Sequence, residues 1–271
     1  MAFRREPLDS NLNIDPDWGV LSQPVVEFRD TSYTVSDNQI LDKLNLKVHS
    51  GEILVLLGRS GSGKTTALKM VNALLSPTSG QVLVKGRPTN AWDPIRLRRS
   101  IGYVIQEVGL FPHFTVEQNV SLVPTLERWP AERIHSRTQE LLRQVSLDPV
   151  QYESRYPRQL SGGQRQRVGV ARALAADPAL LLFDEPFGAL DPVTRLELQT
   201  QFLELRRAFG KTSLFVTHDV REALRLGTRI GLLHRGKLEV LATPSEFVKS
   251  THPEALAFLA CLTEPLTSQN N

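Results

Sequence analysis

Residues 53–65 read Ile-Leu-Val-Leu-Leu-Gly-Arg-Ser-Gly-Ser-Gly-Lys-Thr, and this stretch decides the fold of the chain. The run Ile53–Leu57 is apolar on both faces and is bounded by glycines, which predicts a fully buried strand. Gly58–Thr65 has the complete pattern of a phosphate-binding loop, and Thr65–Leu75 behind it is predicted to be a helix ended by Pro77. A strand, a glycine-rich loop and a helix in this order predict a site for a nucleotide triphosphate.

The residue types of the loop suit the chemistry of phosphate. Glycines let backbone N–H groups approach phosphate oxygens, and the helix N-terminus adds a partial positive charge. We expect Lys64 to reach the β- and γ-phosphates and the Thr65 hydroxyl to ligate Mg²⁺. The alternative, a glycine-rich turn with a solvated lysine, accounts less well for the strand and helix around the loop. The predicted nucleotide-binding residues here are Gly58, Arg59, Ser60, Gly61, Ser62, Gly63, Lys64, Thr65 and Thr66.

Leu180–Glu185 supplies a second half of the site, four apolar residues followed by two acids. Such a run predicts a buried strand, and open α/β sheets bind ligands beyond the carboxyl ends of their strands. Asp184 is suited to hold Mg²⁺ through its water shell, and Glu185 to orient and deprotonate an attacking water. His218 and Gln106 each close another predicted strand, so His218 can point at the γ-phosphate and Gln106 can contact Mg²⁺ and the attacking water. Taken alone, either residue could equally be an ordinary surface side chain.

Composition and charge fit an ordinary globular protein, with 41% hydrophobic and 23% charged residues in 271. Apolar runs are far shorter than the ~20 residues that cross a bilayer, and the first residues lack the apolar core of a secretory signal. The single cysteine, Cys261, fits a reducing compartment. The basic clusters are short and carry no aromatics, which favours solvated helix faces over nucleic-acid binding. We therefore expect a soluble cytoplasmic protein with no nucleic-acid partner.

Strands and helices alternate along most of the chain, which predicts a parallel sheet covered on both faces. Val116–Leu147 departs from this alternation, because its apolar residues follow a helical period and no strand signal interrupts them. We expect a helical subdomain, about residues 107–176, inserted into a domain over residues 25–258, with a mobile polar leader over 1–24 and a short tail over 259–271. Further strands are predicted over 25–28, 45–48, 81–85, 101–105, 179–183 and 213–217, helices over 162–176, 193–208 and 221–226, and a hairpin over 230–241.

The sequence Leu160-Ser161-Gly162-Gly163-Gln164 narrows the hypothesis. Ser161 is a favoured N-cap for the helix that follows, and a helix N-terminus with two glycines is a second anion site. Together with the phosphate loop, this motif makes the chain from about Val25 to Phe258 resemble the nucleotide-binding subunit of an ATP-binding-cassette (ABC) transporter. The resemblance implies a P-loop cassette: an α/β fold with a RecA-like core sheet, a small antiparallel β part and the inserted helical subdomain.

The resemblance also assigns roles to single residues. It implies that Gln106 and His218 are catalytic beside Glu185, that Gln106 joins Thr65 and Asp184 as a magnesium ligand, and that ATP and Mg²⁺ are the cofactors. It further implies that two chains pack head to tail, so that the motif of one chain completes the ATP site of the other. Tyr33 is then expected to stack on adenine, although it could be an ordinary edge-strand tyrosine. The nucleotide contacts implied in this way are Tyr33, Ser161, Gly162, Gly163, Gln164 and Asp191.

Three further segments resemble the ATPases of bacterial importers for quaternary amines such as glycine betaine, choline and carnitine. They are Asp93–Gln106, Gly109–Val116 and Val123–Pro130. This implies an ATP-hydrolysing homodimer, or a paired subunit, on the inner face of the cell membrane. Its partners would be a separate permease docking near Phe111–Phe114 and an extracytoplasmic solute-binding protein. Because the sequence continues only briefly past Phe258, we expect no paired CBS domains of the kind often found in those ATPases.

Other functions stay open at this point. The chain could serve an importer of another small solute, or a transporter that exports lipid or lipoprotein. A non-transport ATPase of translation or DNA repair would usually have two cassettes or a long coiled-coil insertion. A P-loop kinase or GTPase would not need the motif at Ser161–Gln164. The apolar segment around Phe111 and Phe114 could likewise pack beneath the helical subdomain instead of binding a permease.

Overall fold

The computed structural model describes residues 24–106, 108–188 and 190–263 of the chain. The leader expected over residues 1–24 lies almost wholly outside these ranges, as does the end of the tail expected over 259–271. The strands are β1 (Val26–Val35), β2 (Asn38–Val48), β3 (Ile53–Leu57), β4 (Ser79–Val84), β5 (Arg87–Pro88), β6 (Ile101–Val104), β7 (Leu180–Asp184), β8 (Thr212–Thr217), β9 (Arg229–His234) and β10 (Lys237–Ala242). The helices are α1 (Lys64–Val71), α2 (Pro94–Arg99), α3 (Val116–Val120), α4 (Leu122–Leu126), α5 (Ala131–Gln144), α6 (Pro149–Tyr152), α7 (Gly162–Leu174), α8 (Pro192–Phe209), α9 (Val220–Leu226), α10 (Pro244–Phe247) and α11 (Pro253–Thr263).

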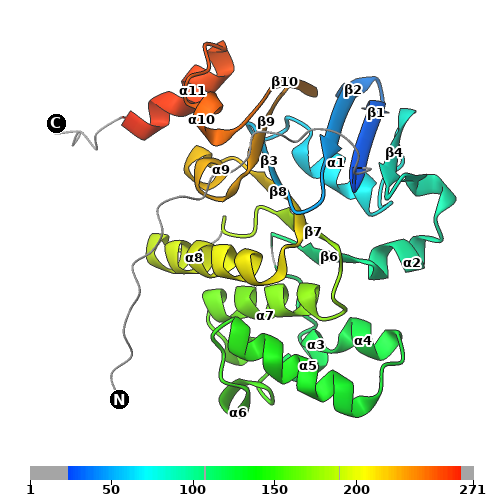
Figure 1. Cartoon of the computed structure of the whole chain (residues 1–271), viewed down its shortest axis with the longest axis vertical. Coiled ribbons are helices and arrows are strands. Elements are labelled where there is room, and N and C mark those ends of the chain that lie inside the picture. The colour runs from blue at the N-terminus through cyan, green and yellow to red at the C-terminus, as the bar shows by residue number, and fades with distance from the viewer. Residues whose placement is uncertain (1–23, 107, 189, 264–271) are drawn as a thin grey trace.

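The core sheet has the strand order β10-β9-β3-β8-β7-β6 and lies across the middle of the molecule (Figure 1). Its internal pairs, β3 with β8 and β9, and β7 with β6 and β8, are parallel, as predicted. Every residue of β3, β7 and β8 is buried, which fits runs that are apolar on both faces. Because these strands are parallel, the segments that follow them meet at one edge of the sheet.

Side chains of β3 alternate between two apolar layers. Leu54 and Leu56 pack with α1 and the antiparallel sheet, whereas Ile53, Val55 and Leu57 pack with the layer that contains α7, α8 and α9. All five are fully buried, and each contributes about 1.5–3 kcal/mol of burial free energy. The strand that leads into the phosphate loop is therefore held rigidly on both faces.

The antiparallel sheet has the order β2-β1-β4-β5, and its first two strands are longer than predicted. The prediction ended the first strand at Phe28, but β1 runs to Val35 through register shifts on either side of Thr31. Asp30 has a positive φ of 43° at this irregularity. The bulge breaks the alternation of apolar and polar residues, which hides the second half of the strand in the sequence.

Helix α1 is shorter than predicted, ending at Val71 and not at Leu75. Asn72 leaves the helix, its side-chain Oδ1 accepts a hydrogen bond from the N–H of Leu74 (3.2 Å), and Ala73 adopts a φ of 53°. The chain thus turns before Pro77 is reached. The prediction was wrong here because it took the proline as the stop and passed over an asparagine, which favours turns.

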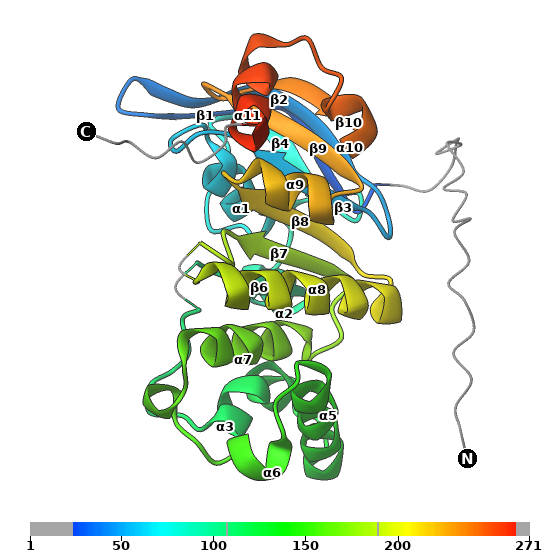
Figure 2. The same cartoon turned by 90° about the vertical axis from the view of Figure 1, so that its left-hand side faces the viewer.

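Helices α3 to α7 form the lower part of the molecule in Figures 1 and 2, and within residues 116–174 the described chain contains no strand. Leu141, Leu142 and Val145 of the predicted stripe are buried. The helical character of Val116–Leu147 is confirmed, whereas the subdomain limits of 107–176 stay a prediction. The helices α10 and α11 had not been predicted, whereas α2 covers the basic cluster Arg96–Arg99, for which a solvated helix face was expected.

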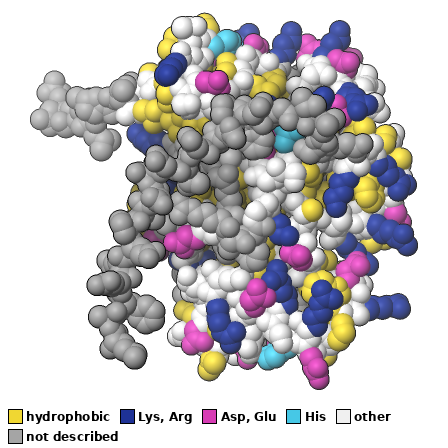
Figure 3. Space-filling model, in the orientation of Figure 1, with side chains coloured by type: hydrophobic (Ala, Val, Ile, Leu, Met, Phe, Trp, Pro, Cys, Tyr) yellow, Lys and Arg dark blue, Asp and Glu magenta, His cyan; other side chains and the backbone are white. Residues whose placement is uncertain are grey.

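Charges of both signs are interspersed over the face shown in Figure 3, with no single basic patch there. Among the described helices, none has both the length and the apolar composition needed to cross a membrane.

Candidate active site

The phosphate loop lies between β3 and α1, at the carboxyl edge of the core sheet. Gly63 has a φ of +100°, and a Cβ added there would lie 2.6 Å from Leu41 Cδ2 and 2.8 Å from the carbonyl oxygen of Ile40. Only glycine fits this position without a backbone shift. No side chain caps the N-terminus of α1, so its first N–H groups stay available to an anion.

Lys64 is 4% exposed, and its ammonium group points back along the loop. Its Nζ donates to the carbonyl oxygens of Gly58 (2.8 Å) and Arg59 (2.9 Å). Burial lowers the pKa of Lys64, and the nearby carboxylates of Glu185 and Asp184 oppose that effect. The loop thus holds a poorly hydrated cation in place, which is the arrangement that a phosphate group would neutralise.

Ser62 shows that the loop has unused hydrogen-bonding capacity. Its hydroxyl oxygen is buried and has no hydrogen-bond partner among the described residues. Buried hydroxyl groups are rarely left unsatisfied in folded proteins. The orphaned hydroxyl therefore fits a loop whose remaining partner is a ligand.

Thr65 and Asp184 come together from the loop and the end of β7. The Thr65 hydroxyl donates to Asp184 Oδ1 (2.8 Å), and the Tyr103 hydroxyl lies 3.4 Å from Asp184 Oδ2. Mg²⁺ prefers oxygen ligands and keeps several of its waters in protein sites. The Thr65 hydroxyl and the Asp184 carboxylate offer oxygens side by side, so the pair fits a Mg²⁺ ion that Thr65 contacts and Asp184 holds through water.

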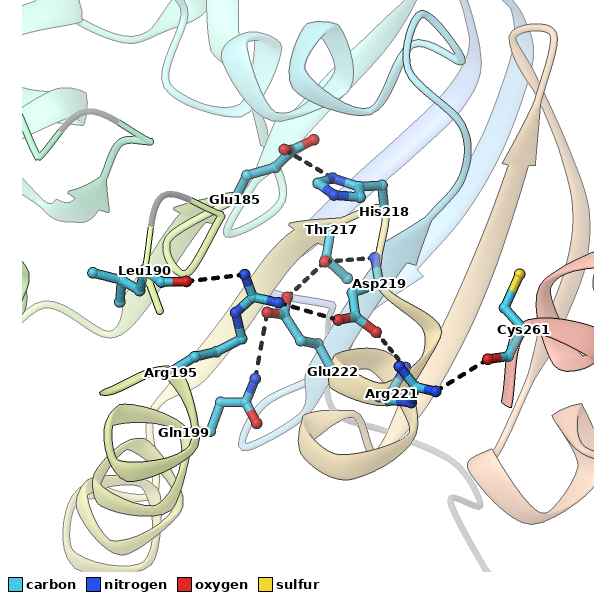
Figure 4. A network of polar contacts seen from close by, with 10 residues as sticks. All are labelled: Glu185, Leu190, Arg195, Gln199, Thr217, His218, Asp219, Arg221, Glu222 and Cys261. Carbon is cyan, nitrogen blue, oxygen red and sulfur yellow. Dashed lines mark hydrogen bonds and ion pairs between the residues drawn. The ribbon is translucent and has the colours of Figure 1, made fainter. Parts of the chain in front are cut away.

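Glu185 and His218 form the second pair of the site. His218 Nδ1 and Glu185 Oε2 are 3.0 Å apart, which joins the residues that follow β7 and β8 (Figure 4). Glu185 has a φ of 45°, and its N–H donates to the carbonyl oxygen of Val216 (3.0 Å). A strained backbone fixed in this way is typical of functional positions.

Gln106 approaches the same acid. A Cβ placed on Gly188 would lie 3.9 Å from both Gln106 Nε2 and Glu185 Oε2, so the amide and the carboxylate flank one glycine. The structure therefore gathers Lys64, Thr65, Asp184, Glu185, His218 and Gln106 at one edge of the sheet. Their individual roles stay predictions.

The motif at Ser161 lies in another part of the molecule. Ser161 caps α7 as predicted: its hydroxyl accepts from the Gln164 N–H (3.2 Å), and the Gln164 side chain accepts from the Ser161 N–H (2.9 Å). Figures 1 and 2 both show α7 among the lower helices and α1 beside the upper sheets, with β6 and β7 between them. The motif and the phosphate loop are therefore separate sites on a single chain.

Two other predicted nucleotide contacts have structural partners. Asp191 Oδ1 accepts from the Thr194 N–H (3.0 Å) and so begins α8, and this contact lowers the pKa of Asp191. Tyr33 is half-buried on β1, where it packs against the apolar layer that contains Leu54 and Leu56 of β3. It lies opposite Leu41 of β2. Leu41 is the residue whose side chain closes over Gly63, so Tyr33 lies one strand away from the phosphate loop.

Sequence reasoning missed several polar residues around the acids. Tyr103 on β6 touches Asp184, and Thr217, Glu222 and Arg195 form a network below His218 (Figure 4). Tyr103 lies on a predicted strand three residues before Gln106, but its contact with Asp184 depends on the pairing of β6 with β7, which no local pattern marks. The network joins α8 to α9, and no local pattern marks that contact.

A glycine-rich loop that opens a helix at the carboxyl edge of a parallel sheet, with acids on a neighbouring strand, defines a P-loop protein. A family model described as ABC transporter matches residues 41–188, and this chain belongs to that family. The chain is 50% identical over 208 residues to the osmoprotectant import ATP-binding protein OsmV of Salmonella typhimurium, covering 77% of this chain and 54% of OsmV. It is also 50% identical over 210 residues to the glycine betaine/carnitine/choline transport ATP-binding protein OpuCA of Bacillus subtilis, covering 78% of this chain and 55% of OpuCA.

The chain thus spans about half the length of these curated relatives. Among solved structures, it is similar to the dimeric structure of MJ0796, a bacterial ABC transporter cassette, with a TM-score of 0.73 and 35% sequence identity. That match covers 81% of this chain and 98% of MJ0796. A second structure of MJ0796 is a dimer in a post-hydrolysis state, bound to ADP and Pi. The predicted cassette fold, with its parallel core sheet, antiparallel sheet and helical part, is confirmed.

Proposed function

We propose that this chain is the ATP-hydrolysing subunit of an ABC importer and powers the uptake of a quaternary-amine osmoprotectant through a separate permease. The observation that carries the proposal is the convergence of the Thr65–Asp184 pair and the Glu185–His218 pair at the edge that holds the phosphate loop. The relatives described as importers of osmoprotectants, betaine, carnitine and choline support the choice of solute. The chain then works at the cytoplasmic face of the membrane.

In the proposed mechanism the phosphate loop and Lys64 hold the β- and γ-phosphates of ATP. Thr65 and Asp184, joined by Gln106, would hold Mg²⁺, which when bound offsets phosphate charge. Glu185 accepts a proton from the water that attacks the γ-phosphorus. The bond between the γ-phosphorus and the β–γ bridging oxygen breaks, and its electron pair leaves with ADP. His218, 3.0 Å from Glu185, keeps that carboxylate oriented and reaches the γ-phosphate.

Two chains would share each ATP. The N-terminus of α7 carries Ser161 and Gly163 but lies away from the phosphate loop of its own chain, so its anion site is free to serve another molecule. The dimers of the MJ0796 cassette support this reading. ATP would then bind the closed pair more tightly than either monomer, and loss of the γ-phosphate would let the pair reopen.

The surface for the permease lies beside Gln106. Phe111 is 41% exposed, whereas Leu110 packs against the apolar layer that contains α7, α8 and α9. The rings of Phe111 and Phe114 are 5.2 Å apart, and Phe111 borders a groove between the core sheet and the helical part. Tyr103 also lines this groove while its hydroxyl reaches Asp184, so the groove lies one side chain away from the ATP site. The groove residues are Arg98, Arg99, Ile101, Gly102, Tyr103, Ile105, Phe111, Leu122, Val123, Arg172, Ala173, Ala176 and Pro178.

The proposal is tested by transport. The chain, reconstituted in proteoliposomes with the permease encoded beside it, should drive ATP-dependent uptake of radiolabelled glycine betaine, choline or carnitine. Phe111→Ala should reduce substrate-stimulated ATPase activity and uptake while basal ATPase activity of the isolated chain survives. Val150→Ala is the control, because Val150 is 87% exposed on α6 and lies outside the groove. ATP-driven uptake of a different solute class would refute the osmoprotectant assignment alone, and an isolated chain without ATPase activity would refute the enzyme assignment.

A further inference from the structure

A carboxylate is buried directly below the His218 loop. Glu222 lies in the first turn of α9 and is 4% exposed, and its neighbours Thr217 and Gln199 are 2% and 6% exposed. None of these three residues touches the phosphate loop in the structure, and the mechanism above does not use them. Burial raises the pKa of Glu222, so its position costs free energy unless its contacts offset that cost.

The contacts of Glu222 hold both sides of His218. The Thr217 hydroxyl donates to Glu222 Oε2 (2.6 Å) and accepts from the N–H of Asp219 (3.0 Å). Thr217 is the residue before His218 and Asp219 the residue after it. The Thr217 hydroxyl therefore bridges the two residues on either side of the histidine. Since the hydroxyl has a single proton, the acceptor at Glu222 fixes its direction. Figure 4 shows His218 above Thr217 and Glu222, with its ring pointing at Glu185.

Helix α8 joins the same network. The Gln199 side chain donates to Glu222 Oε1 (3.3 Å), and the guanidinium of Arg195 lies 3.6 Å from Asp219 Oδ2. Arg195 also donates to the carbonyl oxygen of Leu190 (3.2 Å), immediately before Asp191. The segment that follows the catalytic acid and the loop that carries His218 are therefore joined through side chains of α8.

We propose that Glu222, acting through Thr217, is a positioning residue that holds His218 against Glu185, and that Arg195 and Gln199 join this position to α8 and the Leu190–Asp191 turn. The inference rests on the proposed ATPase function. A capping role does not explain Glu222, because the side chain of Asp219 already caps α9 by accepting from the Arg221 N–H (2.7 Å). The carboxylate is instead aimed at the threonine that orders the histidine loop.

The test is Thr217→Val, which keeps the shape of the side chain in β8 and removes the hydroxyl. Turnover of ATP by the full-length chain should show a kcat lowered roughly tenfold or more with KM for ATP unchanged, because the phosphate loop is untouched. Thr217→Ser should restore most of kcat. Thr212→Val is the matched control: Thr212 lies at the other end of β8, is 3% exposed, and its hydroxyl accepts from the Gly51 N–H (3.0 Å) far from His218. It should keep kcat while losing similar stability.

A second measurement does not depend on turnover. The ring signals of His218, assigned in histidine NMR spectra by comparison with His218→Gln, should shift in Thr217→Val and stay in place in Thr212→Val. Equal losses of kcat in the two valine variants, or an unmoved His218 signal in Thr217→Val, would overturn the positioning role. If the parent chain hydrolyses no ATP, the proposed function fails, and the NMR comparison still decides whether the Thr217 hydroxyl, which donates to Glu222, positions His218.

Discussion

Asn119 holds the loop that we propose as the permease contact, and its removal gives a measurable test of that loop. Asn119 lies in α3 and is fully buried. Its Oδ1 accepts a hydrogen bond from the Phe111 N–H (2.8 Å). Its Nδ2 lies within hydrogen-bonding distance of three carbonyl oxygens, those of Phe111 (3.2 Å), Phe114 (3.2 Å) and Thr115 (2.9 Å). One side chain thus fixes both ends of the Phe111–Phe114 segment.

Asn119→Ala would leave these backbone groups without their partner. A buried polar group without a hydrogen bond costs about 1–3 kcal/mol, but water can reach an exposed loop and replace part of the loss. We therefore expect a decrease of about 2–4 kcal/mol in the free energy of unfolding, measured by urea denaturation at constant m-value. In the assembled transporter, substrate-stimulated ATPase activity should fall because Phe111 and Phe114 lose their fixed positions.

Asn72→Ala serves as the control. Asn72 is 3% exposed, but its side chain makes one hydrogen bond within the described residues, to the Leu74 N–H (3.2 Å). Its loss should cost about 1 kcal/mol and leave coupling intact. If Asn119→Ala is no more destabilising than Asn72→Ala, the hydrogen bonds to the loop do not stabilise it. If it is destabilising but coupling is normal, the ordered loop is not the permease contact.

The remaining predictions concern the ATP site. Glu185→Gln should bind ATP but not hydrolyse it, because the amide keeps the shape and loses the base; gel filtration with ATP at up to tens of micromolar protein should show a dimer, and a monomer at all concentrations would contradict the shared site. Lys64→Ala should weaken ATP binding, and an unchanged affinity by calorimetry would remove Lys64 from the phosphate site. Ser161→Arg should bind ATP as a monomer but neither dimerise nor hydrolyse it, so ATPase activity at the parent rate would exclude a shared site. Because burial raises the pKa of Glu222, the folded state binds its proton more readily than the unfolded chain, and stability is lost as pH rises between the unfolded and folded pKa values. Glu222→Gln removes this pH dependence, so its stability relative to the parent should rise as the pH increases above the ordinary glutamate pKa of about 4.3, measured by urea unfolding; a constant difference would argue against the raised pKa.

The sequence predicted those parts of the fold that rest on continuous patterns. Ile53–Leu57 is apolar on both faces because β3 is buried between two layers, and the structure has the strand at those residues. The Ser161 cap was predicted because an N-cap is local, and the structure adds the reciprocal hydrogen bond from the Ser161 N–H to the Gln164 side chain. Where a pattern was interrupted, the predicted length of the element was wrong. This happened at the register shifts of β1 and at the end of α1 before Asn72.

Contacts between distant segments could not be predicted from the sequence, because they depend on tertiary packing and leave no local pattern. Tyr103 and Asp184 meet because β6 and β7 are neighbours in the sheet, a pairing that no local propensity encodes. Glu222 looks in the sequence like an ordinary acid in the first turn of an exposed helix. It becomes a buried acceptor because Thr217 at the end of β8 and Gln199 of α8 both donate to it.

Gly162 and Gly163 differ in how closely the rest of the chain packs against them. A Cβ at Gly163 would lie 2.5 Å from Thr194 Cγ2, so a larger residue there would require the Thr194 side chain of α8 to shift. At Gly162 the nearest atom, Leu190 Cδ2, would be 3.8 Å away, and packing gives no such requirement. Gly162 therefore keeps the entrance to the N-terminus of α7 open beside the exposed Ser161, where an anion would approach. The phosphate loop of the same chain lies across the sheet, so under the proposed shared site the γ-phosphate at this entrance would be that of ATP bound to a second copy.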